Sequence, residues 1–197
     1  MKILIGCERS GVVRDEFRKL GHDAWSCDLA PSYPGPFEQY HFQCDIREVI
    51  YDYWDMLIAH PPCTDMSVSG ALWFDHPNFP NKRADQKKAL EFFVFLDTFT
   101  AIEKRCMENP VSVVATQHRK PDQYIEPFYF GHAETKKTGL WLNGLPKLKK
   151  KYYVLDSPDV DPHRIHKMAR TENRGELRSI TYKGIAMAMA EQWGELK

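Results

Sequence analysis

The chain has 197 residues, of which 43% are hydrophobic, and its 27 Lys and Arg balance its 27 Asp and Glu. A chain of this length buries roughly 70% of the surface that it exposes when unfolded, so we expect a single domain spanning residues 1–197. No apolar run approaches the ~18 to 20 residues of a membrane span, and the first residues lack the apolar region of a signal peptide. These features predict a cytoplasmic protein without a membrane partner.

The charges are distributed unevenly along the chain. Residues 136–197 carry 13 Lys or Arg against 7 Asp or Glu, which gives this third a formal charge of +6 and leaves −6 on residues 1–135. A polyanion such as a nucleic acid would therefore be met mainly by the C-terminal third. The alternative is a solvated basic surface without a partner.

Five cysteines stand at positions 7, 27, 44, 63 and 106. They are odd in number and contain no CxxC pair, a pattern that favours neither a zinc framework nor a disulfide scaffold. We therefore expect reduced thiols and no metal site.

Strand and helix patterns alternate over the first part of the chain. Strands are expected over residues 2–7, 22–29, 40–46, 55–62 and 106–114, and helices over 12–21 and 84–105. A further strand over 138–142 and a closing helix over 184–196 follow, whereas 31–36 and 156–178 are expected to be loops. The alternation predicts an α/β fold with a mostly parallel, doubly wound sheet flanked by helices.

The expected strands end in residues that suit a binding site. The first is followed by a loop with Gly6 and Gly11, the second ends at Asp28 and the third near Asp45. Backbone N–H groups of such a loop can approach a ligand, and an acid closing the second strand can accept hydrogen bonds from ribose hydroxyls. The spacing is not GxGxxG, which favours a smaller adenosyl ligand over a dinucleotide. The alternative is that each Asp is an ordinary turn residue.

The fourth strand ends in "HPPC", residues 60–63. Two prolines stiffen the exit from the strand and hold Cys63 in a defined direction. Ionising a thiol of ordinary pKa costs only about 1.5 kcal/mol at pH 7.4, so Cys63 is a candidate nucleophile. A buried structural cysteine is the alternative.

Glu108, in "ENP", closes the next strand along the chain. Successive parallel strands end side by side, which would bring Glu108 near Cys63. A partly desolvated, protonated Glu could donate to a ring nitrogen and make a neighbouring carbon electrophilic.

The stretches "ILIGCERSG", "CDL", "CDI", "DMLIAHPPCTDMS" and "CMENP", over residues 3–110, resemble the ordered motifs of the DNA cytosine-C5 methyltransferase family in the compact form often encoded by phages. The resemblance implies a Rossmann-like fold that uses S-adenosyl-L-methionine. It implies that Cys63 adds to carbon 6 of cytosine, that Glu108 contacts ring nitrogen 3, and that carbon 5 takes the methyl group. The cofactor-binding residues implied are Gly6, Cys7, Glu8, Ser10, Gly11, Asp28 (ribose), Leu29, Asp45 (adenine), Ile46 and Pro61.

The resemblance also indicates residues that would contact the target base or its strand. They are Pro62, Ser67, Asn109, Arg119, Lys136, Thr138, Arg164 and Arg178. The family's later Gln-x-Arg-x-Arg motif is not intact here, and Arg119 and the segment 136–138 are rival replacements. The segment after Cys63, residues 64–86, is expected to close over the base.

About 35 residues separate "GLWL" from "RSITYKG". This basic excursion, residues 143–178, is too short for a full target-recognition domain, so we expect weak sequence discrimination or help from a homodimer or protein partner. DNA is the expected substrate. RNA or a free cytosine nucleotide is the alternative within the same chemistry, and a catalytically silent protein that binds nucleic acid or S-adenosylmethionine is the alternative outside it.

Overall fold

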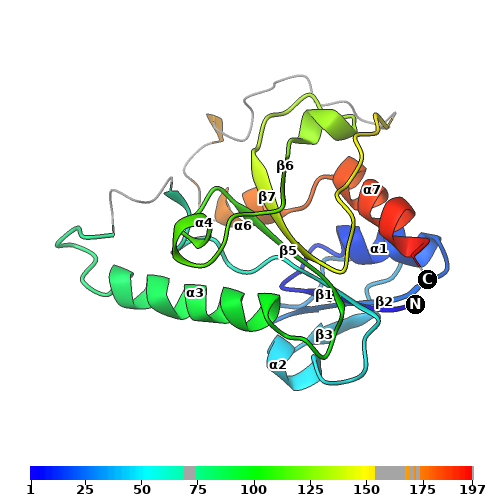
Figure 1. The fold of residues 1–197 in the computed structure, drawn as a ribbon, viewed down its shortest axis with the longest axis horizontal. Coiled ribbons are helices and arrows are strands. Elements are labelled where there is room, and N and C mark those ends of the chain that lie inside the picture. The colour runs from blue at the N-terminus through cyan, green and yellow to red at the C-terminus, as the bar shows by residue number, and fades with distance from the viewer. Residues whose placement is uncertain (69–73, 154–166, 169–170, 172–173, 197) are drawn as a thin grey trace.

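The computed structural model describes residues 1–68, 74–153, 167–168, 171 and 174–196. Seven strands form one sheet in the order β3-β2-β1-β4-β5-β7-β6 (Figure 1). The strands are β1 (Lys2–Gly6), β2 (Asp23–Asp28), β3 (His41–Gln43), β4 (Met56–Ala59), β5 (Lys104–Pro110), β6 (Gln123–Ile125) and β7 (Thr138–Asn143). The first five run parallel, and β7 is antiparallel to both β5 and β6. The expected mostly parallel α/β sheet is confirmed.

Helices cover both faces of the sheet. In β1, Ile3 and Ile5 belong to the core formed with α1 (Val12–Lys19) and α7 (Lys183–Gly194). Leu4 points to the other face and belongs to the core formed with α2 (Ile46–Val49) and α3 (Lys82–Asp97). Because β1 and β4 are buried on both sides, their sequences are almost continuously apolar.

The long expected helix and the strand after it have different boundaries from those predicted. The helix expected over 84–105 is α3, which ends at Asp97, and residues 104–105 already belong to β5. The guanidinium of Arg105 donates to the carbonyls of Asp97, at 3.1 Å, and of Ile102, which stabilises the turn between the two elements. The strand expected over 106–114 ends at Pro110, and α4 (Val114–Gln117) follows it.

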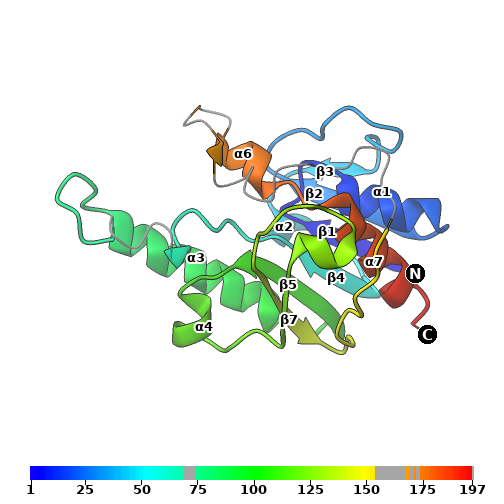
Figure 2. The same cartoon turned by 90° about the horizontal axis from the view of Figure 1, so that it is seen from above.

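Several short elements were not predicted. They are α2, α4, β6, the 3-10 helix η2 (Pro127–Phe130) and α6 (Arg174–Ser179). Helix α6 lies within the polar stretch 156–178 that the sequence predicts to be a loop. In the view of Figure 2, α6 lies in the same half of the molecule as β2 and β3.

The longest described helix, α3, has 16 residues, whereas a membrane span needs ~20. Among the helices that the structure describes, none has both the length and the apolar character to cross a membrane.

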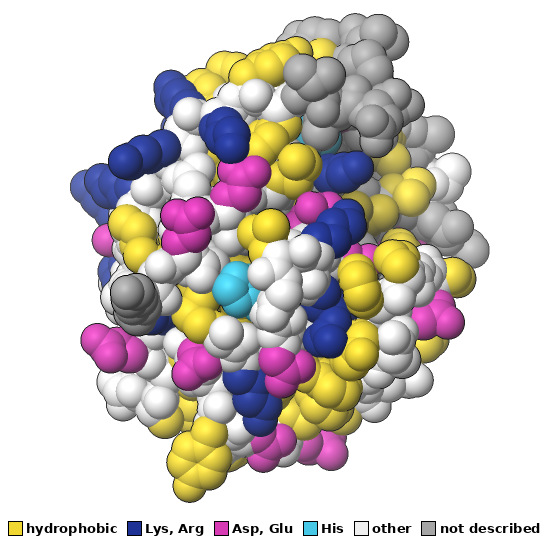
Figure 3. All heavy atoms as spheres, turned by 90° about the vertical axis from the view of Figure 1, so that its right-hand side faces the viewer, with side chains coloured by type: hydrophobic (Ala, Val, Ile, Leu, Met, Phe, Trp, Pro, Cys, Tyr) yellow, Lys and Arg dark blue, Asp and Glu magenta, His cyan; other side chains and the backbone are white. Residues whose placement is uncertain are grey.

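The face bearing α1 and α7 is mixed in charge. Figure 3 shows Lys and Arg side chains there scattered among acidic and hydrophobic ones. Some of these charges are paired: Lys151 Nζ lies 2.5 Å from Glu191 Oε2, and Lys19 Nζ lies 2.6 Å from Glu16 Oε1. Among the described residues, basic side chains on this face are therefore interrupted by acidic and hydrophobic ones (Figure 3).

Candidate functional site

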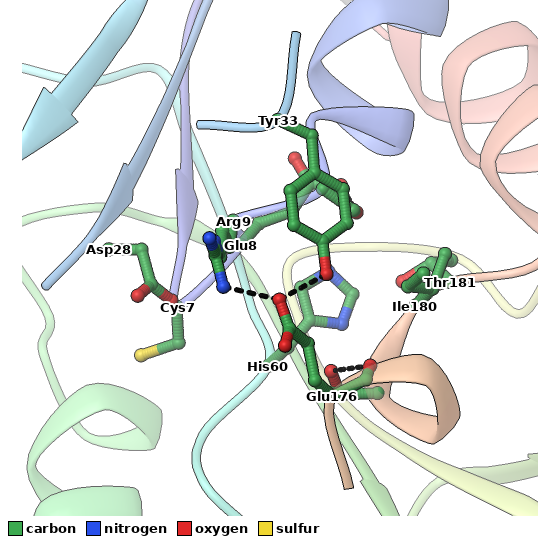
Figure 4. A pocket seen from close by; sticks show the side chains of 11 residues that line it. Cys7, Glu8, Arg9, Asp28, Tyr33, His60, Glu176, Ile180 and Thr181 are labelled. Atoms are coloured by element: carbon green, nitrogen blue, oxygen red, sulfur yellow. Dashed lines mark hydrogen bonds and ion pairs between the residues drawn. The ribbon is translucent and has the colours of Figure 1, made fainter. Parts of the chain in front are cut away.

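A cavity lies where the order of the parallel strands reverses. From β1 the chain moves outward to β2 and β3, and it then returns to place β4 on the other side of β1. In open α/β sheets ligands bind at this point, outside the carboxyl ends of the strands. The cavity has a volume of about 200 Å³. It is lined by Cys7, Glu8, Arg9, Ser10, Asp28, Tyr33, His60, Glu176, Ser179, Ile180 and Thr181 (Figure 4).

The loop between β1 and α1 is held by Glu8, which is only 4% exposed. Its carboxylate accepts from the backbone N–H of Val13 at 2.7 Å and of Arg14 at 3.3 Å, which satisfies free donors at the start of α1. Burial raises the pKa of Glu8, although the nearby His60 and these N–H groups oppose the rise. Glu8 was predicted to bind the cofactor, and the structure shows it shaping the loop that would do so.

Cys7 and Gly11 give this loop its turns. Cys7 follows β1 with φ of 55° and Gly11 precedes α1 with φ of 72°. Both values lie in the left-handed region, which favours glycine and is uncommon for a cysteine. Burial raises the pKa of the Cys7 thiol to about 12, with further contributions from the charges of Asp28 and Asp45. The thiol of Cys7, which lines the cavity, is therefore neutral.

Asp28 is placed where the sequence predicts a ribose-binding acid. It closes β2 and lines the cavity. One of its oxygens, Oδ1, accepts from the backbone N–H of Ala30 at 2.9 Å, which fixes the carboxylate. The next residue, Leu29, has a side chain exposed to solvent (74%), and its carbonyl accepts from Gln43 at 3.5 Å.

The side chain of Asp45 caps a helix, a role that was not predicted. Its side chain accepts from the backbone N–H of Arg47 at 2.9 Å, and Glu48 accepts from the backbone N–H of Asp45 at 3.1 Å. This reciprocal pair is a capping box at the start of α2. Asp45 does not line the cavity. Ile46 is buried, and its side chain packs so closely on Gly6 that a Cβ on Gly6 would lie 2.2 Å from it.

The segment 60–63 is anchored to β5. Strand β4 pairs with β5 in parallel, and the side-chain amide of Asn109 donates to the carbonyl of Pro61 at 2.8 Å. Asn109 is 1% exposed. The carbonyl of Cys63 accepts from the backbone N–H groups of Met66 at 3.0 Å and Ser67 at 2.8 Å, forming a tight turn after the prolines. Asn109 was predicted to contact substrate, and the structure uses it to position the turn that carries Cys63.

Cys63 and Glu108 are close enough for their charges to interact. Burial raises the pKa of the Cys63 thiol, and the carboxylate of Glu108 raises it further. Lys136 and Arg178 oppose this shift. Forming the thiolate in this site therefore costs more than the ~1.5 kcal/mol of an ordinary thiol at pH 7.4.

Glu108 is held in its charged form. Burial alone would raise its pKa, but hydrogen bonds from His60 and Thr138 and the charges of His60 and Lys136 outweigh burial and lower it. The sequence predicts that a protonated Glu108 could donate to a ring nitrogen, whereas the lowered pKa favours the carboxylate in the structure.

His60 is the residue of this site that the sequence analysis did not assign. Its Nδ1 lies 3.2 Å from Glu108 Oε2, and its side chain is 8% exposed. Within the described part of the chain its Nε2 is buried and has no hydrogen-bond partner. Because His60 also lines the cavity, it joins the cavity to Glu108. In the sequence, the position of His60 directly before the two prolines is the feature that could have indicated a place in the site.

Of the two rival basic residues, the structure brings Lys136 to the Cys63–Glu108 pair. Lys136 influences the pKa of both groups, and its Nζ donates to the carbonyl of Arg178 at 2.7 Å. Arg119 is held elsewhere: its Nε and Nη2 each lie 2.8 Å from Asp97, its Nη1 lies 2.7 Å from Asp122, and these bonds raise its pKa.

Two further predicted contact residues, Pro62 and Ser67, belong to the turn that carries Cys63. Pro62 is exposed, and Ser67 forms an isolated antiparallel bridge with Ser112. Arg164 lies outside the described residues, as do residues 69–73 of the segment expected to close over the base.

No protein-family model matches the chain, and a search of curated proteins finds no match. The function is therefore argued from the geometry and chemistry of the site.

Proposed function

We propose that the protein transfers a methyl group from S-adenosyl-L-methionine to carbon 5 of cytosine in DNA through a covalent Cys63 adduct. One observation carries this proposal. Cys63 follows β4 and Glu108 lies in the neighbouring strand β5, close enough to raise the pKa of Cys63, beside the cavity at the reversal of strand order. A nucleophile, a carboxyl group and a ligand cavity at one sheet edge are the parts that this chemistry needs.

The opposite pKa shifts of the pair suit a proton exchange between them. Without substrate, Cys63 holds its proton and Glu108 is charged. For the reaction, Cys63 must attack carbon 6 as a thiolate while Glu108 donates a proton to ring nitrogen 3. The pair therefore keeps the same number of protons, and only their distribution changes when the base arrives. Carbon 5 then takes the methyl group as its bond to the sulfonium sulfur breaks, loss of the carbon 5 proton to water or another base breaks the C–S bond and releases Cys63 as a thiolate, and the proton on ring nitrogen 3 returns to Glu108.

The cavity supports a cofactor with an adenosyl group. When bound, S-adenosylmethionine supplies a methyl group on a positively charged sulfur. Asp28 at the end of β2 fits the ribose, and the loop held by Glu8 fits the methionine part. Because Oδ1 of Asp45 already caps α2, contact with the adenine is assigned to a different group or to Oδ2, which also accepts from Nη1 of Arg47 at 3.3 Å.

The substrate is proposed to be DNA with little sequence discrimination. The family resemblance suggests it, and the excursion over 143–178 is too short to build the interface of ~600 Å² that even a single recognition module uses. RNA or a cytosine nucleotide would engage the same pair of residues, so substrate competition distinguishes them.

Covalent trapping tests the proposal. The protein would be incubated with S-adenosylmethionine and an oligonucleotide that carries 5-fluorocytosine in many contexts, and its intact mass would be measured. Fluorine cannot leave carbon 5 as a proton does, so the enzyme and the oligonucleotide stay joined. We expect an adduct with the wild type and none with Cys63→Ser.

A matched control is Cys44→Ser, which changes another half-buried thiol and should keep the adduct. If S-adenosylmethionine binds but no adduct forms with DNA, RNA or nucleotide, the proposal is wrong and a silent binding protein is the better interpretation. An adduct that survives Cys63→Ser would assign the nucleophile to another residue.

A further inference from the structure

Three side chains meet across the cavity from distant parts of the chain. Glu176 of α6 accepts hydrogen bonds from the guanidinium of Arg9 and from the hydroxyl of Tyr33. Figure 4 shows its carboxylate pointing between these two groups, with His60 beside it. The chain thus places one of its own carboxylates inside the cavity at the strand reversal.

Arg9 and Tyr33 are arranged by contacts that do not involve Glu176. The Nε of Arg9 donates to the carbonyl of Pro31 at 3.0 Å, and the backbone N–H of Tyr33 donates to the carbonyl of Arg9 at 3.1 Å. The guanidinium carbon lies 4.8 Å from the centre of the Tyr33 ring. With Nε bound to Pro31, the terminal nitrogens face the cavity. Both groups donate to the same oxygen, Oε1 of Glu176, so together they form a site for one oxygen of a carboxylate.

Two features of the cavity favour a ligand in place of Glu176: its small free volume and an unpaired buried nitrogen of His60. Its volume of about 200 Å³ is below the ~300 to 1,000 Å³ typical of ligand pockets, and Glu176 is one of the residues that line it. The buried Nε2 of His60 has no partner among the described residues. A ligand that displaced Glu176 would gain both the space and this polar atom.

We infer that Arg9 and Tyr33 form a carboxylate-binding site that Glu176 occupies when no ligand is bound, and that the carboxylate of an amino-acid ligand displaces it. The identity of that ligand rests on the proposed function: it is the methionine carboxylate of S-adenosylmethionine. Glu176 then acts as an internal competitor that weakens cofactor binding. The contact is half-exposed, with 38% of the Arg9 and 36% of the Glu176 side chain accessible, so exchange does not require unfolding of the core.

Calorimetric titration with S-adenosylmethionine tests this inference. Glu176→Gln keeps the shape of the side chain but removes its charge, and we expect it to tighten binding about two- to fivefold, the range of a partly exposed ion pair. Arg9→Gln and Tyr33→Phe should both weaken binding. Using both variants guards against a folding defect in either, which a thermal melt would reveal.

The matched control is Glu191→Gln. Glu191 also accepts from a cation and a tyrosine, Lys151 at 2.5 Å and Tyr153 at 2.8 Å, but it lies on α7 and does not line the cavity. Its substitution should leave binding unchanged. Decarboxylated S-adenosylmethionine provides a second control, because its affinity should not respond to Arg9→Gln.

Two outcomes would overturn the inference in different ways. If S-adenosylmethionine binds but Glu176→Gln binds it no more tightly than Glu191→Gln does, the internal competitor is wrong and the proposed function stands. If neither the wild type nor any variant binds S-adenosylmethionine, the proposed function fails together with the ligand assigned here.

Discussion

The buried carboxylate of Asp97, at the end of α3, should be a main support of the fold. Its side chain is 2% exposed and accepts from Arg119 at 2.8 Å through both Nε and Nη2, from His118 at 2.7 Å and from Asn143 at 2.9 Å. These partners come from the segment after α4 and from β7, so one carboxylate joins three parts of the chain. Asp97→Ala removes it and leaves its donors unpaired.

The cost of Asp97→Ala follows from the exposure of its partners. Removing one member of a buried ion pair costs about 3 to 5 kcal/mol. Arg119 is 30% exposed and keeps Asp122 at 2.7 Å, and His118 is 20% exposed, so water and Asp122 partly replace the lost bonds. We therefore expect the lower end of the range, about 3 kcal/mol, as a drop in the free energy of unfolding.

Urea unfolding of the wild type and the variant would measure this loss. The matched control is Asp75→Ala: Asp75 also receives two bonds from one arginine, Arg83, at 2.7 and 2.5 Å, but its side chain is 73% exposed. We expect no measurable loss there. A drop below about 1 kcal/mol for Asp97→Ala, within the range of exposed pairs, would refute the reasoning.

Three further predictions concern pH and packing. Burial opposes ionisation of Asp97, but the hydrogen-bond and charge partners of Asp97 outweigh burial and lower its pKa. The ionised carboxylate should therefore stabilise the fold above about pH 4, and this stabilisation should be lost as the pH falls. In urea unfolding at a series of pH values, the loss of stability in acid should be smaller for Asp97→Asn than for the wild type. The pH midpoint for iodoacetamide alkylation of Cys63, followed by peptide mass, should fall in Glu108→Gln and rise in Lys136→Gln, because the first removes a negative charge and the second a positive one; midpoints that move the other way would contradict the assigned contacts. Gly184→Ala should lower stability by about 1 to 3 kcal/mol through overpacking, since its Cβ would lie 1.9 Å from a backbone carbonyl of η2, whereas Gly175→Ala meets nothing within 4 Å and should cause no loss in thermal melting.

The parallel half of the sheet could be predicted because its strands are short, apolar and separated by clear breaks. The run "MLIA" of β4 is buried throughout, and the prolines that follow end it. Once five such strands alternate with helices, the carboxyl ends must meet at one edge. This is why the sequence alone predicts that Asp28, Cys63 and Glu108 lie in the same region.

Roles that depend on local hydrogen bonds were harder to predict. Asp45 resembles a ligand contact at a strand end, but the pattern Asp45-x-x-Glu48 is also a capping box, and its Oδ1 accepts from the backbone at the start of α2. Glu8 and Asn109 were assigned to ligands, and they also hold a helix start and a turn, roles that were not predicted. A polar side chain near a site first satisfies buried backbone groups, because leaving them unpaired is costly.

Contacts between distant segments could not be predicted from spacing. Glu176 reaches Arg9 across 167 residues, and His60 reaches Glu108 across 48. The opposite pKa shifts of Cys63 and Glu108 arise from burial and from neighbours such as Lys136, which the linear sequence does not place. The sequence could place Cys63 and Glu108 at one sheet edge, but it could not indicate the direction of their pKa shifts.

The central claim is the transfer of a methyl group to carbon 5 of cytosine. Its most direct test is to incubate the protein with S-adenosylmethionine and unmethylated DNA, digest the DNA to nucleosides and identify the product by mass spectrometry. We predict 5-methylcytosine with the wild type and none with Cys63→Ser. Methylation at the exocyclic nitrogen, or no methylated cytosine from a protein that binds S-adenosylmethionine and DNA, would contradict the account.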